Sequence, residues 1–162
     1  MFLFFGCGSN PDLETLHIKK LTHKLQAIDT EIDPKIAQDL AYDIYAHWTK
    51  LNDEFAPVAS SWLQNTLVNL GLKKKGLCWH WSDSFYNHLV GRYEGFEFVP
   101  AGAFVGSLRE HNVLVVTTKN KSFYDGVVID GWRDRRKLYF IGVTQDTPYQ
   151  WQPRLERIQN GR

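Results

Sequence analysis

Cys78 is the residue whose type and setting most clearly suggest chemistry. It lies in the segment Gly76-Leu77-Cys78-Trp79-His80-Trp81, and an amphipathic helical pattern follows. A helix N-terminus carries about half a positive charge from its unpaired N–H groups, and this charge favours a thiolate. Gly76 lets the backbone turn tightly into such a helix. We therefore expect this thiol to act as a nucleophile rather than as a small buried apolar side chain.

Two later residues have the types that a thiol nucleophile needs. His111 begins a run rich in β-branched residues, and Asp130 ends the next such run. A hairpin centred near Ser122-Phe123 would place residues 111 and 130 side by side across a strand pair. An imidazole can then remove the thiol proton, and a carboxylate can hold that imidazole in one tautomer. The order Cys78, His111, Asp130 predicts a cysteine-dependent acyl-transfer enzyme.

The surroundings of Cys78 also contain side chains of the types that bind zinc, namely Cys78, His80, Asp83 and His88. Their spacing is not one that arranges four ligands tetrahedrally, and no second cysteine-containing half-site follows. We therefore expect no metal and no cofactor. The two cysteines, Cys7 and Cys78, do not form a disulfide framework, and joining them would block the nucleophile.

Composition favours a single globular domain that does not bind nucleic acid. The chain has 162 residues, of which 43% are apolar and 14% aromatic, and this is enough for one packed core. Nineteen basic and 18 acidic residues leave a formal net charge of +1, so no nucleic-acid surface is indicated. No window of about 18 apolar residues occurs, so we expect no transmembrane span.

The helical patterns lie in the first part of the chain. The first expected helix covers residues 12–29, and Asp33-Pro34 supplies an N-cap and a first-turn proline for the second. The third runs from about residue 58 or 60 to residue 70, and the fourth from Cys78 to about Val90. Apolar residues recur at helical spacing in the first, second and fourth of these: Leu13, Leu16, Leu21, Leu25 and Ile28; Ile36, Leu40, Ile44, Trp48 and Leu51; and Trp81, Phe85 and Leu89.

Extended segments follow the helices. The expected strands cover about residues 96–99, 103–107, 111–118, 127–130 and 137–143. The tail, which contains Pro148 and Pro153, is expected to be irregular until a short helix near residues 154–159. Helices that come first and an antiparallel sheet that follows predict the α+β class rather than alternating α/β.

The candidate residues resemble those of a known superfamily. Cys78-Trp79 at a helix start is similar to the papain-like motif, and the order Cys, His, Asp is that of the transglutaminase-like enzymes. Asp130-Gly131-Trp132 resembles the papain-like Asn-x-Trp, in which the Trp shields the bond between His and its orienting residue. The resemblance covers roughly residues 60–142 and implies a papain-like (transglutaminase-like) cysteine proteinase fold. By this match Trp132 is a shielding residue, and Trp79 is a second aromatic that can wall the thiol off from water.

The oxyanion hole departs from the papain pattern. Papain-like peptidases place a Gln a few residues before the Cys, whereas the nearest here, Gln64, is 14 positions upstream on the expected third helix. Gln64 is one candidate donor to an oxyanion, and the backbone N–H of Cys78 is the other. This departure leaves the substrate class open.

These residues predict hydrolysis of an amide or peptide bond through an acyl-enzyme on Cys78, with a peptide, a protein or another amide-bearing molecule as substrate. In a transglutaminase-like reaction an amine would resolve the acyl-enzyme in place of water. The alternative is a non-catalytic module that keeps the fold and binds a peptide or glycan in an aromatic groove. Fast alkylation of Cys78 near neutral pH favours the enzyme, because a buried structural thiol should hardly react.

The first ten residues suggest a lipid anchor. An apolar stretch leads to Gly6-Cys7, which resembles the end of a bacterial lipoprotein signal, although no basic residue precedes it and the stretch is short. A start site placed too far downstream would explain both differences. We expect residues 1–10 to be a signal remnant or an apolar N-terminal segment, and 11–162 to be one domain. Lipidation of Cys7 would place the protein in the cell envelope or periplasm; without it a cytoplasmic location is expected.

Overall fold

The computed structural model describes residues 11–55, 77–134 and 136–156. In this part of the chain, helices precede a sheet, and the predicted α+β class is confirmed. The helices are α1 (Pro11–Gln26), α2 (Pro34–Phe55) and α4 (Cys78–Leu89), and the short 3-10 helices are η1 (Phe123–Asp125) and η2 (Val143–Gln145). The strands are β1 (Phe96–Ala103), β2 (His111–Thr118), β3 (Val127–Asp130), β4 (Tyr139–Gly142) and β5 (Gln152–Pro153).

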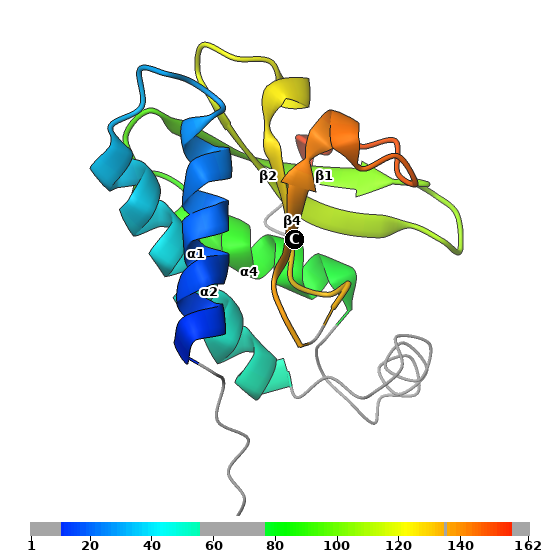
Figure 1. Cartoon of the computed structure of the whole chain (residues 1–162). Helices are drawn as coiled ribbons and strands as arrows, with labels where there is room; N and C mark the ends of the chain where they lie inside the picture. Colours follow the sequence, from blue (N-terminus) through cyan, green and yellow to red (C-terminus); the bar gives the residue numbers. More distant parts are fainter. Residues whose placement is uncertain (1–10, 56–76, 135, 157–162) are drawn as a thin grey trace, which may run out of the picture.

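The five strands form one sheet in the order β4-β3-β2-β1-β5, and every neighbouring pair is antiparallel. The helices pack on one face of this sheet, with α1 and α2 side by side and α4 running beside the strands (Figure 1). The other face is covered by the C-terminal segment through Val143, Tyr149 and Trp151. The central strand β2 is buried along its whole length.

The helical stripes explain most of the helix-covered core. Asp33 accepts a hydrogen bond from the backbone N–H of Lys35 at 2.7 Å and so caps α2 as expected. The apolar stripes of α2 and α4 are buried as predicted in Leu40, Ile44, Trp48 and Leu51 and in Trp81, Phe85 and Leu89. The prediction for α1 holds only in its second half, because Leu13 and Leu16 are 65% and 49% exposed.

Strand β1 corrects the sequence prediction. It is one strand that continues through Pro100 to Ala103, and the separate extended piece predicted over residues 103–107 is wrong. Pro100 lacks an N–H donor, which a strand tolerates at a sheet edge. The strand outside β1 is β5, which pairs only with Ala101 and Gly102, so no strand on that side requires an N–H from Pro100. The Pro100 carbonyl accepts a hydrogen bond from the Arg154 N–H at 2.7 Å. Residues 104–110 form the loop that joins β1 to β2.

Some predicted features lie outside the described residues. These are the third helix with Gln64, the N-terminal segment with Cys7, and residues 157–159 of the last predicted helix. Among the helices that the structure does describe, none has both the length and the apolar character needed to cross a bilayer.

Candidate active site

Cys78 is the first residue of α4, as the sequence predicts. The N-cap residue is Leu77, whose side chain cannot accept a hydrogen bond from the helix, and His80 Nδ1 instead accepts one from the Leu77 N–H at 3.1 Å. Polar caps normally satisfy the free N–H groups of a first turn. Here the His80 N–H turns back to the Leu77 carbonyl at 3.0 Å. The aligned dipoles of this helix start favour a negative charge on the thiol.

His111 and Asp130 meet at one end of the sheet. His111 Nε2 lies 2.7 Å from Asp130 Oδ2, and both side chains are almost fully buried, with exposures of 4% and 1%. The register pairs Leu114 with Ile129, so Asp130 continues opposite Val113 rather than His111. The two residues therefore share a face as diagonal neighbours, within reach of each other because side chains alternate along strands.

Gly131 allows this strand end to approach α4. A Cβ atom at residue 131 would lie 2.5 Å from Cε3 of Trp81 and 3.0 Å from Cε2 of Phe85. Only glycine leaves room for these two core rings, so the middle residue of Asp130-Gly131-Trp132 has a packing role. It brings the carboxylate toward the helix that carries Cys78.

The Asp130 carboxylate is fixed by four donors. Its Oδ1 accepts the backbone N–H groups of Trp132 and Arg133, each at 3.0 Å, and its Oδ2 accepts His111 Nε2 and Arg133 Nε at 2.7 and 2.9 Å. Burial alone would raise the pKa of Asp130, but His111 and Arg133 hold this pKa below its ordinary value. Asp130 is therefore an ionised, immobile partner for the imidazole.

The second ring nitrogen of His111 is left for Cys78. His111 Nδ1 is buried and makes no conventional hydrogen bond with the described residues. Burial lowers the pKa of His111, yet the charge and hydrogen bond of Asp130 and the adjacent Cys78 side chain outweigh it and raise the pKa to about 9. The thiol is thus an electrostatic neighbour of the imidazole. The imidazolium form is favoured, which suits a thiolate–imidazolium pair.

Three aromatic rings enclose the imidazole. The ring centroids of Trp132, Tyr149 and Trp151 lie 5.0, 5.4 and 5.6 Å from that of His111. Tyr149 and Trp151 are stacked on each other, with centroids 4.8 Å apart. Trp132 lies where a shield of the His111–Asp130 bond would lie. Its shielding role stays a prediction.

The C-terminal segment adds a charged support that sequence reasoning missed. Arg133 donates through both terminal nitrogens to the buried Asp146 carboxylate at 3.0 and 2.8 Å. Trp151 Nε1 donates to Asp146 as well, at 2.9 Å. The Arg133 guanidinium also lies 4.1 Å above the Tyr139 ring and 4.5 Å above the Tyr149 ring. Arg133, which directly follows the Asp-Gly-Trp motif, could have been suspected from the sequence, but Asp146 gave no such signal.

Asn112 is a second polar residue that was missed. Its Nδ2 atom lies 3.9 Å from Cys78 Sγ and donates to Glu110 Oε1 at 3.2 Å, and the residue is 4% exposed. Glu110 is tied to the Gly106 N–H at 2.8 Å and to Arg154 at 3.1 Å. The Glu110 carbonyl oxygen lies 4.0 Å from Cys78 Sγ. The start of β2 therefore surrounds the thiol with a carbonyl, an imidazole and a carboxamide.

The remaining side chains near Cys78 are turned to other partners. Trp79 is 38% exposed and stacks on His80, with ring centroids 3.7 Å apart. Its shielding of the thiol stays a prediction. His88 Nε2 lies 2.7 Å from Asp43 Oδ1 on α2. In the described part of the chain, no three His, Cys, Asp or Glu residues are grouped as metal ligands would be.

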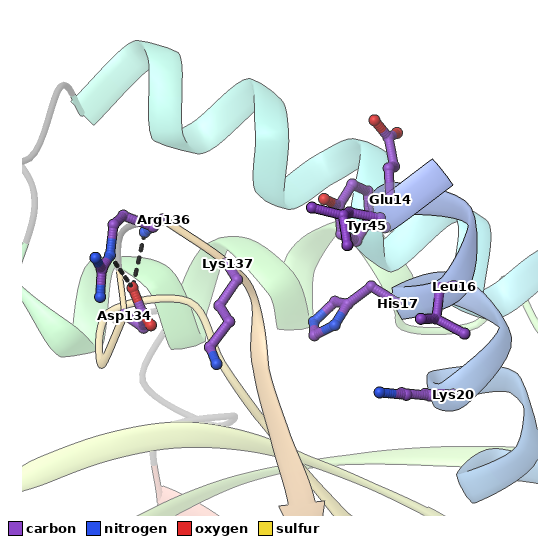
Figure 2. Close-up of a pocket in the computed structure, with 9 residues that line it drawn as sticks. Glu14, Leu16, His17, Lys20, Tyr45, Asp134, Arg136 and Lys137 are labelled. Carbon is purple, nitrogen blue, oxygen red and sulfur yellow. Dashed lines mark hydrogen bonds and ion pairs between the residues drawn. The ribbon is translucent and has the colours of Figure 1, made fainter. Parts of the chain in front are cut away.

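A separate pocket lies between α1 and the segment before β4. Figure 2 shows its mostly charged lining, with His17 and Lys20 from α1, Tyr45 from α2, and Asp134 paired with Arg136. His17 Nε2 is held by the Leu138 carbonyl at 2.7 Å. The residues that line this pocket include none of the Cys78, His111 and Asp130 set.

Comparisons of the chain with family models, with curated proteins and with solved structures give no match. The case for a function therefore depends on the geometry of the site.

Proposed function

We propose that this protein is a cysteine-dependent acyl-transfer enzyme of the papain-like, transglutaminase-like type, and that it hydrolyses an amide or peptide bond. The observation that carries the proposal is the orientation of His111. Asp130 occupies Nε2 at 2.7 Å, so Nδ1 is the nitrogen available to the thiol at the start of α4. A nucleophile, a base and an orienting carboxylate in this relation are what thiol catalysis requires.

The reaction follows from these positions. The Cys78 proton moves to His111 Nδ1, and Sγ attacks the substrate carbonyl carbon. The C–N bond breaks as His111 returns the proton to the leaving amine, which leaves a thioester on Cys78. Water then attacks the thioester with His111 as base, releases the acid and restores the thiol.

Two donors are candidates for stabilising the oxyanion. The Cys78 backbone N–H lies in the first helical turn, where N–H groups lack intrahelical acceptors. Asn112 Nδ2 lies 3.9 Å from Sγ, beside the atom to which the oxyanion carbon would be bonded. In this proposal Asn112 supplies the carboxamide that papain-like peptidases supply from a Gln before the Cys.

Alkylation provides the first test, with Cys7 as an internal reference. The protein is produced without lipidation of Cys7 and is treated with iodoacetamide at pH 7, and both cysteine peptides are followed by mass spectrometry. We expect Cys78 to react at least about 10-fold faster than free cysteine, and His111→Ala to remove this advantage while Cys7 is unaffected. Equal rates for Cys78 in the two proteins would contradict the proposal.

An acyl probe provides the second test. With p-nitrophenyl acetate we expect a burst of p-nitrophenol equal to the enzyme concentration, and an acetyl group on Cys78 that Cys78→Ala cannot form. A suitable control is Tyr124→Ala, because Tyr124 is a 54% exposed aromatic in η1 at the other end of β2. A protein that binds peptides but gives neither fast alkylation nor a burst would be the non-catalytic module.

A further inference from the structure

A pocket of about 350 Å³ is lined by Phe104, Val105, Ser107, Gln150 and Gln152. We call it the Phe104 pocket. One wall is the loop of residues 104–110, at the right of Figure 1, and the other comes from the chain around β5.

The Phe104 pocket is connected to the catalytic residues on two sides. Ala103, which precedes Phe104, pairs with His111 across β1 and β2. The Tyr149 ring lies 5.4 Å from the His111 ring and 5.8 Å from the Phe104 ring, so one aromatic side chain separates the base from the pocket. At the other end of the loop, the Glu110 carbonyl lies 4.0 Å from Cys78 Sγ.

Phe104 has a backbone conformation that is unfavourable for its side chain. Its φ angle is +53°, which bulky residues rarely adopt, while its ring is 40% exposed. The loop enforces this conformation, because the Ser107 N–H and hydroxyl both donate to the Phe104 carbonyl, at 3.1 and 2.7 Å. A glycine would fit the same backbone with less strain. Strained residues gather at active sites and ligand clamps, so the exposed Phe104 ring is a candidate ligand contact.

The lining defines the chemistry of that ligand. It combines a phenyl ring, a branched aliphatic group, a hydroxyl and two carboxamides, and none of these carries charge. Arg109 lies 4.9 Å above the Phe104 ring, whereas the charge of Arg154, which packs behind Gly102, is balanced by Glu110 and Glu156. The Arg109 guanidinium therefore disfavours a cationic group at the ring. An apolar side chain can contact the ring, while the Gln amides can bind a peptide backbone.

We propose that the Phe104 pocket binds an apolar residue of a peptide substrate on the leaving-group side of the scissile bond. We assign the leaving-group side because His111, which protonates the leaving amine, must lie next to that amine. The Phe104 pocket is on the His111 side of the site, separated from the imidazole by the Tyr149 ring. This inference rests on the proposed acyl-transfer function and adds the substrate class to it.

Acyl transfer to amines tests the pocket without a known substrate. By microscopic reversibility, the leaving-group site also binds an amine that attacks the acyl-enzyme. The enzyme is acetylated with p-nitrophenyl acetate in the presence of leucinamide, glycinamide or lysinamide, and the N-acetyl products are measured. The new amide bond replaces the Cys78 thioester, and the amine proton passes through His111 to the thiol.

We expect leucinamide to be acetylated about 10-fold or more faster than lysinamide. Phe104→Gly should reduce this preference to less than about 3-fold. It should also slow the p-nitrophenol burst, because p-nitrophenol is an apolar leaving group that would contact the same ring. The melting temperature should be unchanged or higher, because the backbone strain is relieved. Tyr124→Ala should behave as wild type.

The outcomes separate the two proposals. Three results would overturn the proposed role of the Phe104 pocket and leave the acyl-transfer function intact, provided that the burst depends on Cys78. They are equal use of leucinamide and lysinamide, the absence of an N-acetyl amine product, and a preference for leucinamide that survives Phe104→Gly. The absence of a Cys78-dependent burst overturns both.

Discussion

Arg133 donates its Nε hydrogen to the Asp130 oxygen that also binds His111, at 2.9 Å and 2.7 Å respectively. The other end of the same guanidinium is bound by both oxygens of Asp146. Negative and positive groups therefore alternate from Asp146 through Arg133 and Asp130 to His111. The carboxylate that we propose to orient His111 is thus held by a cation outside the proposed catalytic set, and Arg133 competes with His111 for the negative charge of Asp130.

Asp130→Asn should lower the pKa of His111, because the amide removes the negative charge that raises it to about 9. The alkaline limb of kcat/KM should move to lower pH, and turnover should fall by about 1–3 orders of magnitude, less than in Cys78→Ala. Rates of p-nitrophenyl acetate hydrolysis from pH 5 to 10 measure both effects. An alkaline limb that stays in place would show that it does not report His111.

Arg133→Met should shift the same limb in the opposite direction. Without the guanidinium, no cation other than His111 offsets the negative charge of Asp130, so the pKa of His111 should rise. The change also leaves Asp146 buried without its cation, and we expect the free energy of unfolding to fall by about 3–5 kcal/mol. Urea titration measures this loss. Adding Asp146→Asn should recover part of it, because the unpaired charge is removed.

The parts of the site that the sequence predicts are those encoded locally. A cysteine at a helix start, a histidine at a strand start and an aspartate at a strand end can each be inferred from a short window. The meeting of His111 and Asp130 required only that β2 and β3 form a hairpin, whereas the approach of Cys78 depends on how α4 packs beside the sheet. The diagonal offset of Asp130 from His111 could not be predicted, because it depends on the register of that hairpin.

The parts that were missed depend on long-range packing. Tyr149 and Trp151 lie in a tail with no helical or strand periodicity, so no pattern indicates that this tail covers a sheet face beside His111. Asn112 lies within the strand predicted over residues 111–118, and nothing in the sequence distinguishes it from its neighbours. Only the position of α4 shows that its carboxamide lies next to Cys78.

Trp132→Ala should have a smaller effect on turnover than His111→Ala. The Trp132 ring lies 5.0 Å from the His111 ring, and its loss would let water reach the His111–Asp130 bond without removing a reacting group. Hydrolysis rates of the two variants beside wild type give the ranking. A larger defect in Trp132→Ala would mean that the ring acts on the substrate directly.

Asn112→Ala should reduce kcat by about 10²–10³-fold, the usual effect of losing one oxyanion donor. Alkylation of Cys78 by iodoacetamide should change much less, because this reaction forms no oxyanion. Asn112→Asp is the matched control, since it keeps the shape but places a carboxylate beside the sulfur, and it should slow both reactions. If Asn112→Ala slowed alkylation as much as turnover, its role would be to support the thiolate.

The free energy of unfolding should decrease as the pH rises from about 6.5 to 9. The pKa of His111 is raised from 6.5 to about 9 in the folded protein, so the native state binds more protons than the unfolded state across this interval. The stabilisation is complete below the unfolded pKa and is lost as the pH passes through the folded one. Urea titrations at intervals of half a pH unit should show this slope in wild type and a flatter profile in His111→Gln. Equal slopes in the two proteins would mean that His111 is not held as an imidazolium by Asp130.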